Sequence, residues 1–167
     1  MAKVLTANFS IRLSPTYTDA TAFDSELGTF AYLLTQTSAA GAAATAADIM
    51  FADRRTLTAT SEDLDLAGIL TDAYKDVLTY AVVCGFLVRN RSTTTTEILA
   101  VGGAAANQFI NWVGNSSDIV NVGPNGFMFL WSPVDGYAVT AGTGDLLKID
   151  AGADTIIYDI IVIGTSA

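Results

Sequence analysis

The stretch VLTYAVVCGFLVRN, residues 77–90, contains a continuous run of small and apolar residues from Ala81 to Val88. This run is much shorter than the roughly 20 apolar residues that a membrane-spanning helix requires. Turn-forming and polar residues surround it, and its valines favour extended backbone, so it predicts a buried β-strand. The only cysteine of the chain, Cys84, lies inside the run. We expect it to be an inert core residue, because free cysteines are usually buried.

Similar short runs follow one another through the rest of the chain, and glycine or proline separates most of them. Helical patterns are rare, and the best candidates are residues 19–27 and 71–74. About eight strands at this spacing predict an all-β fold, a β-sandwich or jelly roll, over residues 48–167. The runs are RTLTAT, EDLDLAG, VLTYAVVCGFLVRN, TTTTEILAVGG, DIVNVGPNGFMFLWSP, GYAVTAG, DLLKIDAG and DTIIYDIIVIG.

Two further strands are predicted near the start of the chain. In KVLTANFSIRL, residues 3–13, apolar and polar side chains alternate, as they do in a strand with one buried face. In GTFAYLLTQ, residues 28–36, the side chains of Phe30, Tyr32 and Leu34 fall on one side of the predicted strand.

The alanine-rich stretch QTSAAGAAATAA, residues 36–47, contains no large side chain that would anchor it in a core. Such a composition predicts a flexible linker or an extended arm. We therefore divide the chain into residues 1–47, an N-terminal arm or hairpin that ends in this linker, and residues 48–167, the jelly-roll-like β-sandwich.

The composition limits the possible functions. Of the 167 residues, 51% are apolar and only 15% are charged, whereas roughly 25% charged residues is usual. We therefore expect copies of the chain or another protein to cover part of the surface.

The net charge of −9 argues against binding to nucleic acid or to anionic membranes. The start of the chain, MAKVLTANFS, lacks the apolar run of a signal peptide.

The chain contains no histidine, which excludes Ser-His-Asp and Cys-His catalysis and histidine-ligated metal sites. EILAVGGAAANQF, residues 97–109, has paired glycines after an apolar run but lacks the lysine of a phosphate-binding loop and the third glycine of a dinucleotide motif. We interpret it as a strand, residues 98–101, that turns at Gly102 and Gly103 and packs closely against another backbone.

Paired carboxylates are the minimum for glycoside hydrolysis. Asp63 and Asp65 would share one face of a strand, and Asp72 and Asp76 lie close in sequence. Alternation of Asp with Leu is also typical of a half-buried strand with one solvated face, and we favour that interpretation. The spacing does not match a calcium-binding EF-hand loop. We predict no catalytic residue, no cofactor and no metal site, so the protein is not expected to be an enzyme.

Four aromatic residues are candidates for a platform that stacks on sugar rings, namely Trp112, Trp131, Tyr137 and Tyr158. The alternative is ordinary packing. Trp131 ends the apolar segment GFMFLW, which is typical of a core or of a subunit interface.

Several segments of the body resemble a recurrent small virion protein of tailed bacteriophages. In that group, a strand with a Leu-Asp-Leu signature leads through a Leu-Thr-Asp turn to a long strand that ends in Arg-Asn. A Gly/Pro turn before an aromatic strand, a Leu-Leu-Lys-Ile strand and a final strand ending in Ile-Gly follow. The matching segments are Leu64 to Leu66, Leu70 to Asp72, Val77 to Asn90, Gly123 to Trp131, Leu146 to Ile149 and Ile156 to Gly164.

This resemblance implies a jelly-roll-like capsid decoration or cement protein. Such a protein would bind the major capsid protein on the outer capsid surface as a symmetric oligomer, a dimer or a trimer. It would be made in the cytoplasm of the host bacterium and be found on the virion. The alternative is a β-sandwich module of a phage tail or fibre that binds host glycans.

Overall fold

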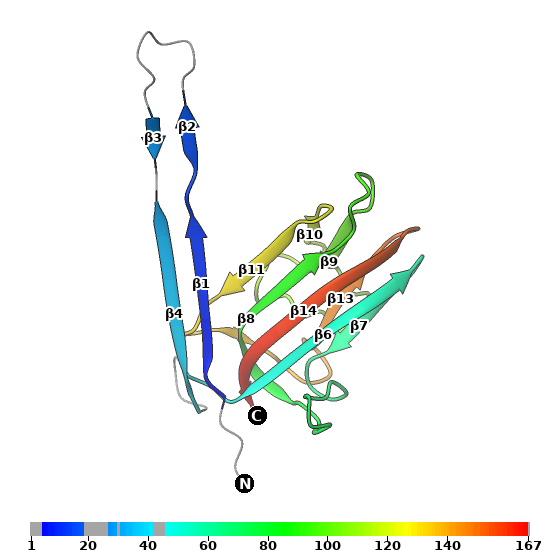
Figure 1. Cartoon of the computed structure of the whole chain (residues 1–167). Helices are drawn as coiled ribbons and strands as arrows, with labels where there is room; N and C mark the ends of the chain where they lie inside the picture. Colours follow the sequence, from blue (N-terminus) through cyan, green and yellow to red (C-terminus); the bar gives the residue numbers. More distant parts are fainter. Residues whose placement is uncertain (1–4, 19–26, 30, 42–45, 167) are drawn as a thin grey trace.

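The computed structural model describes residues 5–18, 27–29, 31–41 and 46–166. These residues form fourteen β-strands and no helix, so the predicted all-β fold is confirmed (Figure 1). There are more strands than the eight or so expected, because the N-terminal part and a connecting loop add short ones. Residues 71–74, a helix candidate, lie in a turn, and residues 19–26 of the other candidate fall outside the described residues.

Two antiparallel sheets form the body of the molecule. The larger sheet has the order β11-β8-β14-β6, and the short strand β12 also pairs with β8. Its strands are β6 (Ile49–Thr58), β8 (Tyr80–Asn90), β11 (Phe127–Trp131), β12 (Tyr137–Ala138) and β14 (Thr155–Ser166). The smaller sheet has the order β10-β9-β13-β7. Its strands are β7 (Ser61–Asp65), β9 (Leu99–Gly102), β10 (Ile119–Val122) and β13 (Leu146–Asp150).

Both sheets contribute side chains to one core. The long strand β14 shows how, because its alternate residues Ile156, Tyr158, Ile160 and Val162 are all buried. Each fully buried side chain of this size contributes roughly 1.5–3 kcal/mol to folding. The partners from the smaller sheet are Leu64, Leu99, Val101, Val122, Leu147 and Ile149. Cys84 is buried, as predicted, and burial raises the pKa of its thiol.

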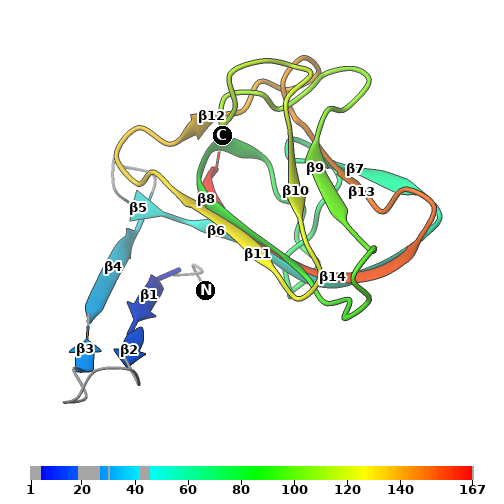
Figure 2. The same ribbon diagram turned by 90° about the horizontal axis from the view of Figure 1, so that it is seen from above.

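The N-terminal strands form a long antiparallel ribbon, which stands away from the body at its outer end (Figures 1 and 2). It consists of β1 (Ala7–Leu13) paired with β4 (Tyr32–Ala40), continued by β2 (Thr16–Thr18) paired with β3 (Leu27–Thr29). We call these four strands the ribbon. A short strand, β5 (Ala46–Ala47), pairs with the end of β4 in parallel, just before β6 begins.

The alanine-rich stretch predicted as a linker is only partly described. Residues 36–40 belong to β4. Of these, residues 36–38 pair with β1 and residues 39–40 pair with β5, so this portion is regular strand. Residues 42–45 lie outside the described part of the chain. Small side chains suit this place, because Ala46 and Ala47 are buried where the ribbon joins the body.

The paired glycines end a strand, as predicted. Strand β9 ends at Gly102, and Gly102 and Gly103 both have positive φ angles, of 103° and 70°. A Cβ atom at Gly102 would lie 2.8 Å from the carbonyl oxygen of Asp118. The glycines therefore allow the close backbone approach that the sequence indicated.

Candidate interaction surface

The larger sheet has an unusual second face. Along β11 the side chains of Met128 and Leu130 pack against the core, so the alternate residues Phe127, Phe129 and Trp131 point away from it. We call the side of the larger sheet that points away from the core the outer face. Antiparallel sheets with one solvated face usually carry polar residues on that side. Here the whole alternating set of β11 is aromatic.

Neighbouring strands extend this apolar surface across the sheet. Leu87 of β8 is paired with Phe129, and Ile161 of β14 is paired with Leu87. Ile163, also on β14, is paired with Met50 at the β6 edge. Most of these side chains are half-buried, whereas Phe127 is 64% exposed. The outer face is thus an apolar surface across four strands.

A glycine allows Trp131 to lie flat on this face. Gly85 is paired with Trp131, and a Cβ atom there would lie 2.5 Å from the indole ring. The indole Nε1 is buried and has no hydrogen-bond partner among the described residues. A buried donor without a partner costs about 1–3 kcal/mol. Apolar contact, rather than hydrogen bonding, therefore holds this ring in place.

The ribbon contacts the outer face through one aromatic residue. The ring of Phe9 on β1 lies edge-on to Phe129 and to Trp131, with centroids 4.8 Å and 4.9 Å apart. A groove of about 310 Å³ lies between the ribbon and the sheet. Its lining is mainly apolar and consists of Phe9, Ser10, Ile11, Arg12, Leu87, Phe127 and Phe129.

Charged side chains border one end of the outer face. Asp159 of β14 accepts hydrogen bonds from Arg54 Nε at 2.6 Å and from Arg91 Nη1 at 2.9 Å. The bond from Arg54 is the main reason that the pKa of Asp159 is lower than usual, and Arg91 lowers it further. Arg89, paired with Phe127, bonds to Asn125 instead. This end of the face therefore has three arginines and one carboxylate.

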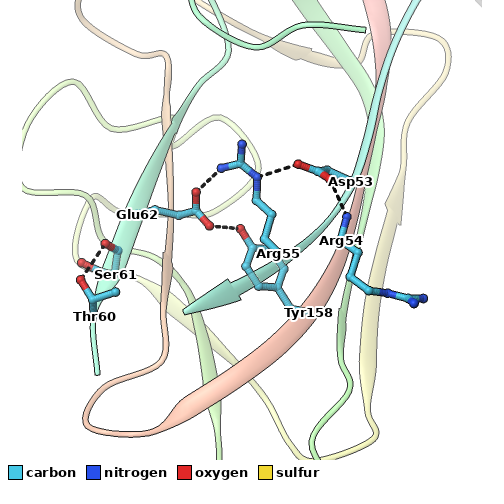
Figure 3. Close-up of polar contacts among 7 residues, drawn as sticks. All are labelled: Asp53, Arg54, Arg55, Thr60, Ser61, Glu62 and Tyr158. Atoms are coloured by element: carbon cyan, nitrogen blue, oxygen red, sulfur yellow. Dashed lines mark hydrogen bonds and ion pairs between the residues drawn. The ribbon is translucent and has the colours of Figure 1, made fainter. Parts of the chain in front are cut away.

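A second polar network lies on the other side of the larger sheet and joins it to the smaller one (Figure 3). Arg55 of β6 pairs with Glu62 of β7 and with Asp53. The Tyr158 hydroxyl donates to Glu62 Oε1 at 2.5 Å. Burial, followed by this bond, raises the pKa of the Tyr158 phenol above its ordinary value. The network links the edge strands of the two sheets and is a structural feature of the body.

The candidate carboxylates are spread over a strand and a loop. Asp63 is exposed on β7 between the half-buried Glu62 and the buried Leu64, which is the pattern of a strand with one solvated face. Asp65 accepts a hydrogen bond from the amide of Ala67 at 2.9 Å.

Asp72 caps its own turn, because its Oδ1 accepts hydrogen bonds from the amides of Tyr74 and Asp76. Asp63 and Asp72 both line a cavity of about 270 Å³, which Arg55 and Lys75 also line. Within the described ranges, no three His, Cys, Asp or Glu side chains are grouped in a way that could hold a metal ion.

The four predicted platform aromatics do not form one surface. Trp112 packs edge-on against the core residue Phe86 at 5.2 Å and donates its indole N–H to the Phe109 carbonyl. Tyr158 is fully buried, and Tyr137 packs against the core. Only Trp131 lies on the outer face.

Its ring neighbours there, Phe9 and Phe129, were not among the predicted candidates, and neither was Phe127 further along β11. A signal for two of them was present in FMFLW, where both alternating sets are apolar. In the described parts of the chain, no helix has the length and apolar character to cross a membrane. Comparison with protein-family models, curated proteins and solved structures gave no match.

Proposed function

We propose that this protein is a structural component of a bacteriophage particle, a decoration or cement protein that binds the outer capsid surface as a symmetric oligomer. The observation that carries the proposal is the apolar outer face with the ribbon projecting beside it. A surface of this kind on a soluble protein is typical of a site that another protein covers. The resemblance of the body segments to small virion proteins is the reason that we name a bacteriophage particle as the partner.

The strand order supports a jelly-roll form of the body. Nearly every step along the chain from β6 to β14 crosses between the two sheets, and the first and last of these strands lie side by side. Apart from the short strand β12, the orders β6-β14-β8-β11 and β7-β13-β9-β10 place eight strands in two sheets of four. Eight strands in two packed sheets are typical of jelly rolls, which occur in viral capsid proteins as well as in lectins.

A cement protein acts by binding and catalyses no reaction. Many copies that each bridge neighbouring capsid subunits stabilise the shell by multivalency, so each contact can be weak. The net charge of −9 also disfavours nonspecific binding to the packaged nucleic acid. The rigid body would provide the contact area, while the ribbon extends the reach of each copy.

The proposal is tested with particles that lack the protein. Purified protein should bind them saturably, at a fixed ratio to the major capsid protein, and should raise the temperature at which they release nucleic acid. An unrelated acidic protein of similar net charge is the control for charge effects. Absence of binding, together with normal resistance of the bare particles to heat and osmotic shock, would refute the proposal.

The alternative, a glycan-binding module of a tail or fibre, remains a prediction. Three of its four candidate aromatics contact the core, as described above. A glycan array with the intact chain is the direct test. Reproducible binding that Trp131→Ala abolishes, with unchanged thermal stability, would favour the glycan function.

A further inference from the structure

The ribbon has one apolar and one polar side. Pairing of Ile11 with Leu34 and of Leu13 with Tyr32 puts these four side chains on the same side as Phe9. The opposite side carries Asn8, Ser10, Arg12, Leu33, Thr35 and Thr37. We call the first side the apolar stripe. Nearer the body the same side carries Gln36 and Ser38, so the apolar stripe occupies the outer part of the β1–β4 pair.

Only the base of the apolar stripe is covered by the body of its own chain. Phe9 packs on the aromatic row of β11. Further out, Leu13 and Tyr32 remain 54% and 47% exposed. A two-stranded ribbon is only marginally stable in water without packing on one face. The described residues therefore leave the outer part of the stripe largely uncovered.

The outer face is incomplete in the same way. The contact that begins at Trp131 and Phe129 continues to Phe127, which is largely exposed. The groove between the ribbon and the outer face, which Phe127, Leu87 and Ile11 help to line, lies beside this contact. One chain thus presents both an uncovered stripe and an uncovered groove, and within the chain the two surfaces already pack on each other at Phe9.

We propose that a second copy of this chain inserts the outer part of its apolar stripe, Leu13 and Tyr32, into the groove between ribbon and outer face. The occupant is a second copy because its stripe has the chemistry that already packs on this face in each chain.

This inference rests on the proposed function, which includes a symmetric oligomer, and it names the surface through which that oligomer forms. It is tested on the purified full-length chain without capsids, by sedimentation velocity over a range of concentrations. The wild type should form an oligomer. Leu13→Glu and Phe127→Glu should each raise the dissociation constant at least about tenfold, because a charge would enter an apolar contact.

Leu33→Glu is the matched control. Leu33 neighbours Tyr32 on the same strand, is 65% exposed and lies on the polar side of the ribbon, so the variant should associate like the wild type. All three replaced side chains are exposed, and unchanged melting temperatures would confirm that the variants fold.

A mixing experiment distinguishes a contact between the stripe of one copy and the groove of another from a contact between identical patches on both copies. The Leu13→Glu chain keeps an intact groove, and the Phe127→Glu chain keeps an intact stripe. A mixture should therefore associate more tightly than either variant alone. A monomeric wild type, equal weakening by Leu33→Glu, or absence of rescue in the mixture would each overturn the inference. None of these results bears on capsid binding by the individual chain, which the particle experiment measures separately.

Discussion

The ring of Phe9 lies edge-on to the ring of Trp131, with centroids 4.9 Å apart, and this contact joins two parts of the molecule that differ in kind. Phe9 belongs to a projecting ribbon, and Trp131 belongs to the edge strand of the larger sheet. Because the Phe9 ring packs on both Phe129 and Trp131, we expect the direction of the ribbon to depend on this aromatic cluster.

Replacing Phe9 by alanine should loosen the ribbon while leaving the body folded. Aromatic pairs contribute about 0.5–1.5 kcal/mol beyond their buried area. Hydrogen exchange of the amides of β1 and β4 should therefore become faster by roughly tenfold, whereas the amides of β8 and β14 keep their protection. Ser10→Ala, on the polar side of the ribbon, is the control. Equal acceleration in both variants would contradict the anchoring role of Phe9.

Gly85→Ala should destabilise the body. The added Cβ would lie 2.5 Å from the Trp131 ring and 2.6 Å from the Leu130 carbonyl oxygen, so ring or backbone must shift. Overpacking of this kind costs about 1–3 kcal/mol, which thermal unfolding measures. Gly123→Ala is the matched control, since no atom outside its chain neighbours lies within 4 Å of a Cβ there. Equal melting temperatures for the two variants would show that Trp131 moves freely.

Tyr158→Phe should lower the free energy of unfolding by about 1–2 kcal/mol, because Glu62 loses a hydrogen bond in a partly buried site. Chemical denaturation monitored by circular dichroism measures the change. The control, Tyr32→Phe, removes the hydroxyl of an exposed tyrosine on the ribbon and should change stability little. A stability of Tyr158→Phe equal to that of the wild type would mean that the Arg55 pair alone satisfies Glu62.

The Asp159 ion pairs should make stability depend on pH in acid. The pKa of Asp159 is lower in the folded chain than in the unfolded chain, mainly because Arg54 donates a hydrogen bond to it. The carboxylate therefore stabilises the fold above its unfolded pKa of about 3.9, and this contribution is lost as the pH falls through the lower folded value. Asp159→Asn should flatten the fall in melting temperature below about pH 4.

The effect should be small and should shrink in high salt, because exposed ion pairs are screened. Asp118→Asn, which replaces an exposed carboxylate next to the smaller sheet, serves as the control. If both variants lost the same amount of pH dependence, the Arg54 and Arg91 contacts would not be the cause.

Much of the fold was predictable because its signals are local. Alternation in residues 3–13 indicated the strand that became β1, and the paired glycines at Gly102 indicated the end of β9. The apolar run around Cys84 indicated a buried strand. The strand conformation of residues 36–40 was missed, because small polar and alanine side chains have no strong strand preference of their own. Only the partner strand makes that segment regular.

The candidate surface was harder to predict than the strands. Trp131 was singled out, and its segment was assigned to a core or an interface, but the sequence offered Trp112 and Tyr158 as equal candidates. The structure separates them. Trp112 packs on Phe86, Tyr158 is buried beside Glu62, and Trp131 lies under Phe9. Phe9 and Phe127 are more than a hundred residues apart in the chain, so no local pattern brings them to one groove.

The sequence by itself determined that the chain is all-β, acidic and without histidine, and that alternate residues of its strands lie on opposite sides. It did not determine which side faces the core. In TIIYDIIVI, residues 155–163, and in FMFLW, residues 127–131, both alternating sets are largely apolar. The choice was made by long-range pairing of β14 with β6 and β8 and by the position of the smaller sheet, which covers one side of the larger sheet and not the other.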